Sequence, residues 1–105
     1  MKVLYRQTAS DDIVRQFRYS LLTAEAPEIA LRFREAVRRT IQSLGQNPQV
    51  GPRYSSANPR LRDLRSWPVV GFEVIRIYYA LDADAMHIIR ILHSKRDVRR
   101  ILQNE

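Results

Sequence analysis

The sequence contains no cysteine, so neither a disulfide bond nor a thiolate metal site is available to it. No apolar run approaches the roughly 18 residues that a membrane-spanning helix needs. The apolar stretch near the N-terminus is also too short for a signal peptide. We therefore expect a cytoplasmic protein that works in a reducing compartment.

Glycine and histidine are scarce as well. Gly45, Gly51 and Gly71 are the only glycines and lie far apart, which excludes a glycine-rich phosphate loop. His87 and His93 are the only histidines, and no third ligand follows them at a spacing known from metal sites. We expect no metal ion and no cofactor.

Acidic residues are too few to balance the basic ones. The chain has 18 lysines and arginines against 11 aspartates and glutamates, a formal charge of +7. All but two of the basic residues are arginine, whose planar guanidinium group pairs bidentately with phosphate or carboxylate. This bias predicts an anionic partner, although a GC-rich genome that favours arginine codons is an alternative explanation.

With 105 residues, 45% of them apolar, the chain is long enough for one core, and we expect a single domain over residues 1–105. Val3–Tyr5 is predicted to form a short strand. A helix is expected to begin near Thr8 or Ser10, with Asp11 and Asp12 at the positive end of its dipole. Its apolar positions recur at helical spacing: Ile13, Val14, Phe17, Leu21 and Ala24.

A second helix is predicted from Pro27, which suits a first helical position, to the region of Gly45 and Asn47-Pro48, which ends it. The short connection between the two helices indicates an antiparallel hairpin. Residues 45–60 are rich in glycine, proline and serine and read as a loop. The apolar stripe of the second helix consists of Ile29, Ala30, Phe33, Val37, Ile41 and Leu44.

Three strands are predicted to follow, over Leu61–Arg65, Phe72–Leu81 and Met86–His93. The last strand is apolar on nearly both faces, as expected of a central strand. Asp97 can begin a final helix, in which Val98, Ile101 and Leu102 have helical spacing. The order is β-α-α-β-β-β-α, an α+β fold in which a helical hairpin packs on a small, mostly antiparallel sheet with a C-terminal helix.

Basic residues on or beside these strands are the candidates for function. They are Arg60, Arg62, Arg65, Arg76, Arg90, Lys95 and Arg96. An arginine inside an apolar strand, as at position 90, is costly to bury unless paired. Arg90 can form a salt bridge to Asp63 or Glu73, or it can recognise an anion in a groove.

Metal-free RNA cleavage is one chemistry that such residues could support. It needs a general acid or base and cations that offset the charge of the phosphorane. His93 could be the acid or base, and Arg62, Arg65 or Arg96 could supply the cation.

Several sequence motifs, in this order and spacing, resemble the ParE/RelE superfamily of bacterial type II toxin–antitoxin toxins over essentially the whole chain. They are Leu44-Gly45-Gln46-Asn47-Pro48 with Gly51, Leu61-Arg62-Asp63-Leu64-Arg65, Trp67-Pro68-Val69 with Gly71-Phe72-Glu73, Ile77-Tyr78-Tyr79, and the run from Ile89 to Asp97. The resemblance implies the fold read above.

The superfamily contains two activities on this one fold. RelE-like members are ribosome-dependent mRNA endonucleases that typically rely on basic residues of the sheet and a tyrosine, or a His-Tyr pair, at the end of the last strand. ParE-like members poison DNA gyrase. This chain has His93-Ser94 at that strand end and therefore lacks the tyrosine. It looks closer to the ParE branch, with His93 as a strand-end residue that packs or hydrogen-bonds beneath the last helix.

The resemblance implies a toxin that acts by binding, without a catalytic site, and that a cognate ParD-like antitoxin neutralises by lying across the hairpin and sheet. The residues expected to bind target or antitoxin are Arg62, Arg65, Arg76, Arg90, Lys95 and Arg96. A RelE-like endonuclease is the alternative, with Arg62, Arg65, His93 and Arg96 as its candidate residues. Direct nucleic-acid binding through the basic face and a non-toxic family member are further alternatives.

Overall fold

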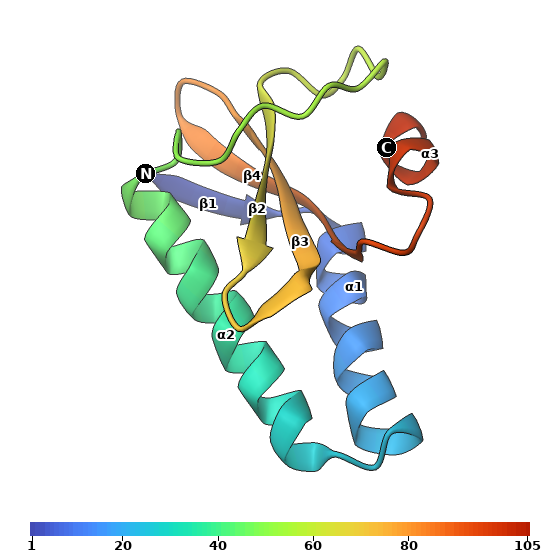
Figure 1. Ribbon diagram of the computed structural model, residues 1–105. Helices are drawn as coiled ribbons and strands as arrows, with labels where there is room; N and C mark the ends of the chain where they lie inside the picture. The colour runs from blue at the N-terminus through green and yellow to red at the C-terminus, as the bar shows by residue number, and fades with distance from the viewer.

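A four-stranded sheet forms the centre of the fold, and the computed structural model describes all residues from 1 to 105 (Figure 1). The strands are β1 (Lys2–Tyr5), β2 (Leu64–Val69), β3 (Phe72–Leu81) and β4 (Ala85–His93), in the spatial order β1-β4-β3-β2. β1 pairs with β4 in parallel, and the other two pairings are antiparallel. The predicted fold class and the central position of the last strand are confirmed.

Two helices form the expected hairpin against one face of the sheet. α1 (Gln7–Arg18) continues through a π-helical turn, η1 (Tyr19–Thr23), and α2 (Pro27–Gln46) begins with proline, as predicted. Figure 1 shows that the tip of the hairpin projects beyond the sheet and that α3 (Val98–Gln103) stands apart from the hairpin. The Asp97 side chain caps α3 by accepting from the Arg100 N–H at 3.3 Å. No helix in the structure has both the length and the hydropathy that a membrane span requires.

Each face of the sheet buries its own hydrophobic cluster. The larger cluster joins Phe33 and Val37 of the hairpin to alternate residues of the central strands, among them Ile77, Tyr79 and Ile91. The smaller cluster lies on the α3 side and contains Leu61, Leu64, Tyr78, Ala80, Ile89, Leu92 and Leu102. Because side chains alternate along a strand, the consecutive residues Tyr78 and Tyr79 of β3 enter different clusters.

The first helix begins at Gln7, one residue before Thr8 and three before Ser10, the two predicted starting points. Asp11 and Asp12 therefore fall in its second turn and not at the end of the dipole. Val14 and Leu21, expected on the buried stripe, are 49% and 37% exposed. Asp12 of this helix is buried instead, because it forms an ion pair with Arg90 on β4.

The first strand of the C-terminal sheet was predicted over Leu61–Arg65, but β2 runs from Leu64 to Val69. Asp63 has a φ of +49°, a turn conformation that prevents an earlier start of the strand. Pro68 is tolerated because β2 lies at the edge of the sheet, and the pairing register shifts just after it.

Candidate binding sites

A groove lies between α2 and the turn that joins β2 to β3, two segments that Figure 1 shows side by side. Its volume is about 690 Å³. The turn is fixed to the helix by Thr40, whose hydroxyl donates to the Ala36 carbonyl at 2.7 Å and accepts from the Val70 N–H at 3.2 Å. Phe72 stacks edge-on against the buried Phe33, with ring centroids 5.5 Å apart. These contacts fix the β2–β3 turn in position beside α2, and the two segments form the walls of the groove.

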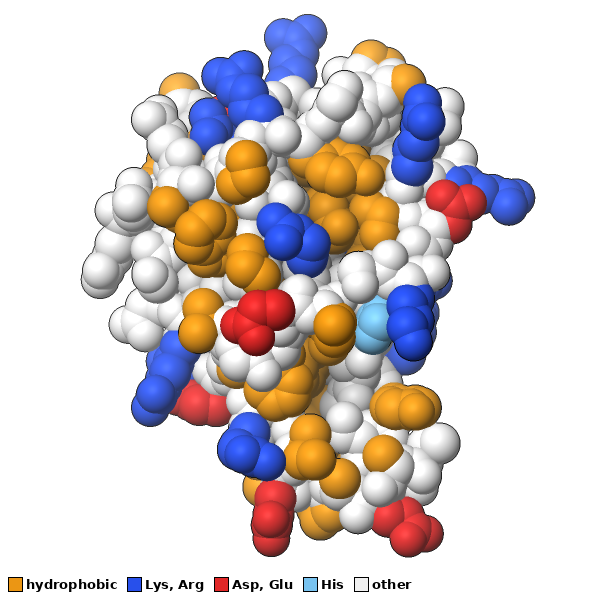
Figure 2. All heavy atoms as spheres, viewed as in Figure 1, with side chains coloured by type: hydrophobic (Ala, Val, Ile, Leu, Met, Phe, Trp, Pro, Cys, Tyr) orange, Lys and Arg blue, Asp and Glu red, His pale blue; other side chains and the backbone are white.

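The lining of the groove combines apolar and cationic side chains. Arg32 and Arg39 come from α2, and the apolar contribution comes from both walls: Ile29, Ala36, Trp67, Val70 and Phe72. Val70 is 63% exposed and Ile29 41% exposed, so the apolar lining is accessible to a partner. Figure 2 shows the same character for the whole face, where hydrophobic side chains gather over the sheet and the hairpin and most cations lie toward the margin.

Glu35 is the one carboxylate of the groove, and neighbouring arginines neutralise it. Arg38 donates to it at 2.6 and 2.9 Å, and Arg39 donates at 3.0 Å. The Arg38 hydrogen bonds, followed by Arg39, lower the pKa of Glu35 to about 2. Arg32 makes no ion pair, so the groove keeps an unpaired positive charge.

Arg65 holds the loop before β2 and is only 11% exposed. Its Nη1 donates to the carbonyl oxygens of Gln49 and Gly51 at 3.1 and 3.0 Å. The Tyr79 hydroxyl donates to the Pro48 carbonyl at 2.8 Å and accepts from the Gly51 N–H at 3.0 Å. Burial raises the pKa of this hydroxyl, which keeps it protonated and able to donate.

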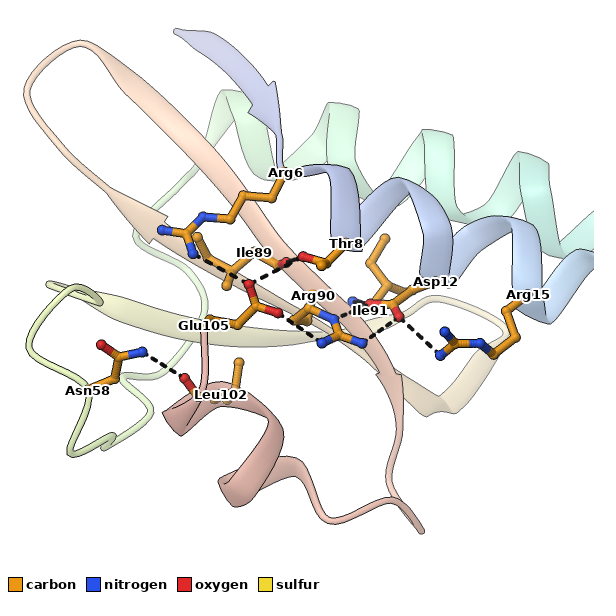
Figure 3. Close-up of polar contacts among 10 residues, drawn as sticks. All are labelled: Arg6, Thr8, Asp12, Arg15, Asn58, Ile89, Arg90, Ile91, Leu102 and Glu105. Atoms are coloured by element: carbon orange, nitrogen blue, oxygen red, sulfur yellow. Dashed lines mark hydrogen bonds and ion pairs between the residues drawn. The ribbon is translucent and has the colours of Figure 1, made fainter.

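Arg90 joins α1 to the end of the chain (Figure 3). Its Nε and Nη2 donate to the two oxygens of Asp12 at 2.7 and 2.8 Å, and its Nη1 donates to Glu105 at 2.8 Å. Asp12 also accepts from the Ile91 N–H at 2.9 Å. It thereby gives a hydrogen-bond partner to a backbone group of β4 that lies beyond the end of β1. The salt bridge predicted to Asp63 or Glu73 is wrong, because α1 brings a different carboxylate to the guanidinium.

His93 lies at the end of β4, where its Nδ1 accepts from the Lys95 N–H at 3.0 Å. It pairs in register with Ile75, so it faces the hairpin side of the sheet and not the α3 side, contrary to prediction. Arg65 pairs with Tyr79, which lies four residues further along β3 than Ile75, the partner of His93. Four residues of a strand span about 13 Å. His93 is therefore not brought together with Arg65, whereas Arg96 lies in the turn after His93 and its backbone N–H donates to the His93 carbonyl at 3.0 Å.

The remaining predicted residues lie at two ends of the sheet. Lys95 and Arg96 are exposed on the turn between β4 and α3. Arg76 is half-buried and donates to the Ser66 hydroxyl at 3.0 Å. Arg62 lies at the opposite end and lines a second pocket with Arg6 and Arg60.

Sequence reasoning missed the groove arginines and Arg6. Arg32 and Arg39 read only as the polar side of an amphipathic helix, because nothing in the sequence places the β2–β3 turn beside them. Arg6 reaches its pocket because β1 pairs with β4, more than 80 residues away in the sequence. The Trp67 to Phe72 phrase was the one available indication of the groove.

The sequence matches the family described as ParE toxin of the type II toxin–antitoxin system, parDE, over residues 3–98. This match over nearly the whole chain places the protein among the toxins of type II toxin–antitoxin systems. Within that class, the chain belongs to the ParE toxin family. No curated protein matches the sequence.

A solved structure described as the chromosomal ParDE toxin–antitoxin system from P. aeruginosa has a similar fold. The TM-score is 0.66 at 20% sequence identity, and the alignment covers 89% of this chain and 95% of that chain. At this identity the similarity concerns the fold. The resemblance to the ParE branch seen in the sequence is confirmed by the family match.

Proposed function

We propose that the protein inhibits bacterial growth by poisoning DNA gyrase in the cytoplasm, and that a cognate antitoxin neutralises it by binding in the α2 groove. Membership of the ParE family supports the choice of gyrase over the ribosome. The separation of His93 from Arg62 and Arg65 supports an action by binding.

The groove is the observation that carries the antitoxin part of the proposal. Its apolar lining fits one side of an amphipathic segment, and the unpaired Arg32 fits acidic residues on the other side of that segment. We expect a neighbouring reading frame to encode a small DNA-binding protein with an acidic C-terminal tail. The complex should weaken at high salt while the toxin stays folded, and an affinity independent of salt would contradict the role given to the arginines.

A substitution in the groove tests where the antitoxin binds. Val70→Asp places a carboxylate in the apolar lining of the groove. Removing this carboxylate from water on binding is costly, and it repels an acidic segment. We therefore expect at least about tenfold weaker antitoxin binding, measured by titration calorimetry. The matched control is Val74→Asp, because Val74 is 54% exposed on β3 and does not line the groove. Equal losses for both variants would exclude the groove as the binding site.

The target is tested with purified toxin in two parallel assays. We expect inhibition of gyrase supercoiling with accumulation of cleaved DNA, and no cleavage of mRNA on ribosomes. In cells, induction should activate the SOS response before translation falls. Cut mRNA with an early loss of translation would instead establish the RelE-like endonuclease alternative.

A further inference from the structure

A second pocket, separate from the α2 groove, lies where β3 turns into β4. It has a volume of about 300 Å³ and takes cationic side chains from segments far apart in the sequence. Arg6 follows β1, while Arg60 and Arg62 belong to the loop before β2. His87 and Asp82 complete the polar part of its lining.

The positive charge of this pocket is not neutralised from within. Arg60 and Arg62 are exposed and make no ion pair, and Arg6 reaches only Glu105, at 3.5 Å. The single carboxylate of the lining, Asp82, is occupied: it pairs with His87 at 2.6 Å and accepts from the backbone N–H groups of residues 84 and 85. The guanidinium groups therefore remain available to an anion from outside.

The arrangement suits a phosphate better than a carboxylate. One arginine fork satisfies the two oxygens of a carboxylate, whereas three guanidinium groups from separate segments can surround the tetrahedral oxygens of a phosphate. The pocket is also larger than a bare phosphate, and Ala80, Leu81 and Ile89 contribute its apolar lining. Ala80 and Ile89 are buried in the core, so a sugar ring can pack against the half-buried Leu81. These three side chains offer no hydrogen-bond partner to a 2′-hydroxyl, which favours deoxyribose.

We propose that this pocket binds a phosphodiester group of DNA, with the adjoining deoxyribose against Leu81. Ala80 and Ile89 belong to the cluster on the α3 side of the sheet, whereas the α2 groove lies beside the hairpin, so DNA and a groove-bound protein occupy different sites. The proposal goes beyond the function proposed above, since the purified toxin should contact DNA without gyrase.

The test is a fluorescence-anisotropy titration of the purified protein with a short labelled single-stranded DNA over a range of salt concentrations. Arg60→Gln/Arg62→Gln should weaken binding about tenfold and lower the slope of log affinity against log salt by about 0.7, the value for one lost phosphate contact. The matched control is Arg99→Gln/Arg100→Gln, which removes the same charge from the exposed side of α3. It should leave affinity and slope nearly unchanged.

Competition distinguishes a DNA backbone from free phosphate. Thymidine 5′-monophosphate should displace the labelled DNA at a lower concentration than inorganic phosphate does, and RNA of the same sequence should bind no more tightly than DNA. The proposal is overturned if the unmodified protein does not bind DNA, if both arginine pairs weaken binding equally, if inorganic phosphate competes as well as the nucleotide, or if RNA binds more tightly. Circular dichroism confirms that both variants are folded, which is expected because neither pair makes an ion pair.

Discussion

Asp12 is the one charged residue that the fold buries, at 2% exposure, and it accepts hydrogen bonds from Arg90 and from the Ile91 backbone. Removal of one partner of a buried ion pair leaves the other charge without compensation, which costs more than the pair itself contributes. Arg90 is only 12% exposed and cannot recover its hydration in place. The pair therefore makes the contact between α1 and β4 specific.

Asp12→Ala should lower the free energy of unfolding by about 3–5 kcal/mol, because it leaves Arg90 with Glu105 alone. Urea denaturation measures the loss. Asp11→Ala, at the exposed neighbouring position, should cost about 0.5 kcal/mol. A similar cost for both substitutions would show that the buried pair has no special role.

At the residue scale the sequence predicts that an arginine within an apolar strand needs a partner, but it does not identify that partner. Asp12 lies 78 residues before Arg90, and only the packing of α1 on the sheet brings the two together. Arg65 shows the same limit. From the sequence, Arg65 is interpreted as a surface charge. In the structure its guanidinium group donates hydrogen bonds to two backbone carbonyls of the loop before β2.

At the scale of elements, Gly51 and Gly45 differ in whether their position can accept a side chain. A Cβ at position 51 would collide with the Tyr79 hydroxyl and lie 2.8 Å from the Ser66 carbonyl oxygen, so the loop before β2 can approach the sheet only through glycine. Gly45 lies within α2, where a Cβ would meet only Val3, at an ordinary 3.7 Å. The first glycine is required by packing, and the second weakens its helix.

Gly51→Ala should lower the free energy of unfolding by about 1–3 kcal/mol because the loop must move away from Tyr79. Gly45→Ala should raise it by up to about 1 kcal/mol, since alanine favours the helix. Thermal or urea unfolding of the two variants gives the comparison. A stabilised Gly51→Ala variant would contradict the close packing of this loop.

The elements themselves were largely predictable, because periodicity and breaker residues act locally. β3 has the predicted bounds, and α2 begins at Pro27 as expected. The start of β2 was missed because it depends on the φ of a single aspartate. The α2 groove was missed because it depends on the position of a turn relative to a helix distant in the sequence.

For the whole molecule, the dependence of stability on pH is set by carboxyl groups that have basic partners. The pKa of Glu35 is lowered to about 2 by hydrogen bonds from Arg38 and then Arg39, and that of Asp82 to about 2 by a hydrogen bond to His87 and then by backbone N–H groups. A depressed carboxyl pKa stabilises the fold at pH values above the ordinary pKa of the group. That stabilisation is lost as the pH falls toward the folded value, and it is small for each group because both carboxyls are exposed and solvent screens their ion pairs.

The melting temperature should therefore fall as the pH is lowered from about 5 to about 2, the window between the ordinary and folded pKa values. Glu35→Gln and Asp82→Asn should each be less stable at neutral pH and show a shallower decline, as followed by circular dichroism. Glu25→Gln, at an exposed residue without an ion pair, should follow the unmodified protein. A decline unaffected by either substitution would assign acid sensitivity to other carboxyls.

The position of β4 in the sequence has a consequence for biosynthesis. Both β1 and β3 pair with this strand, which occupies residues 85–93 of a 105-residue chain. The hairpin therefore has no complete sheet to pack on until residue 93 has been synthesised, and pairing between distant segments closes slowly. The toxin should therefore acquire its fold only after β4 has left the ribosome, and a ribosome stalled before residue 85 should display no folded molecule.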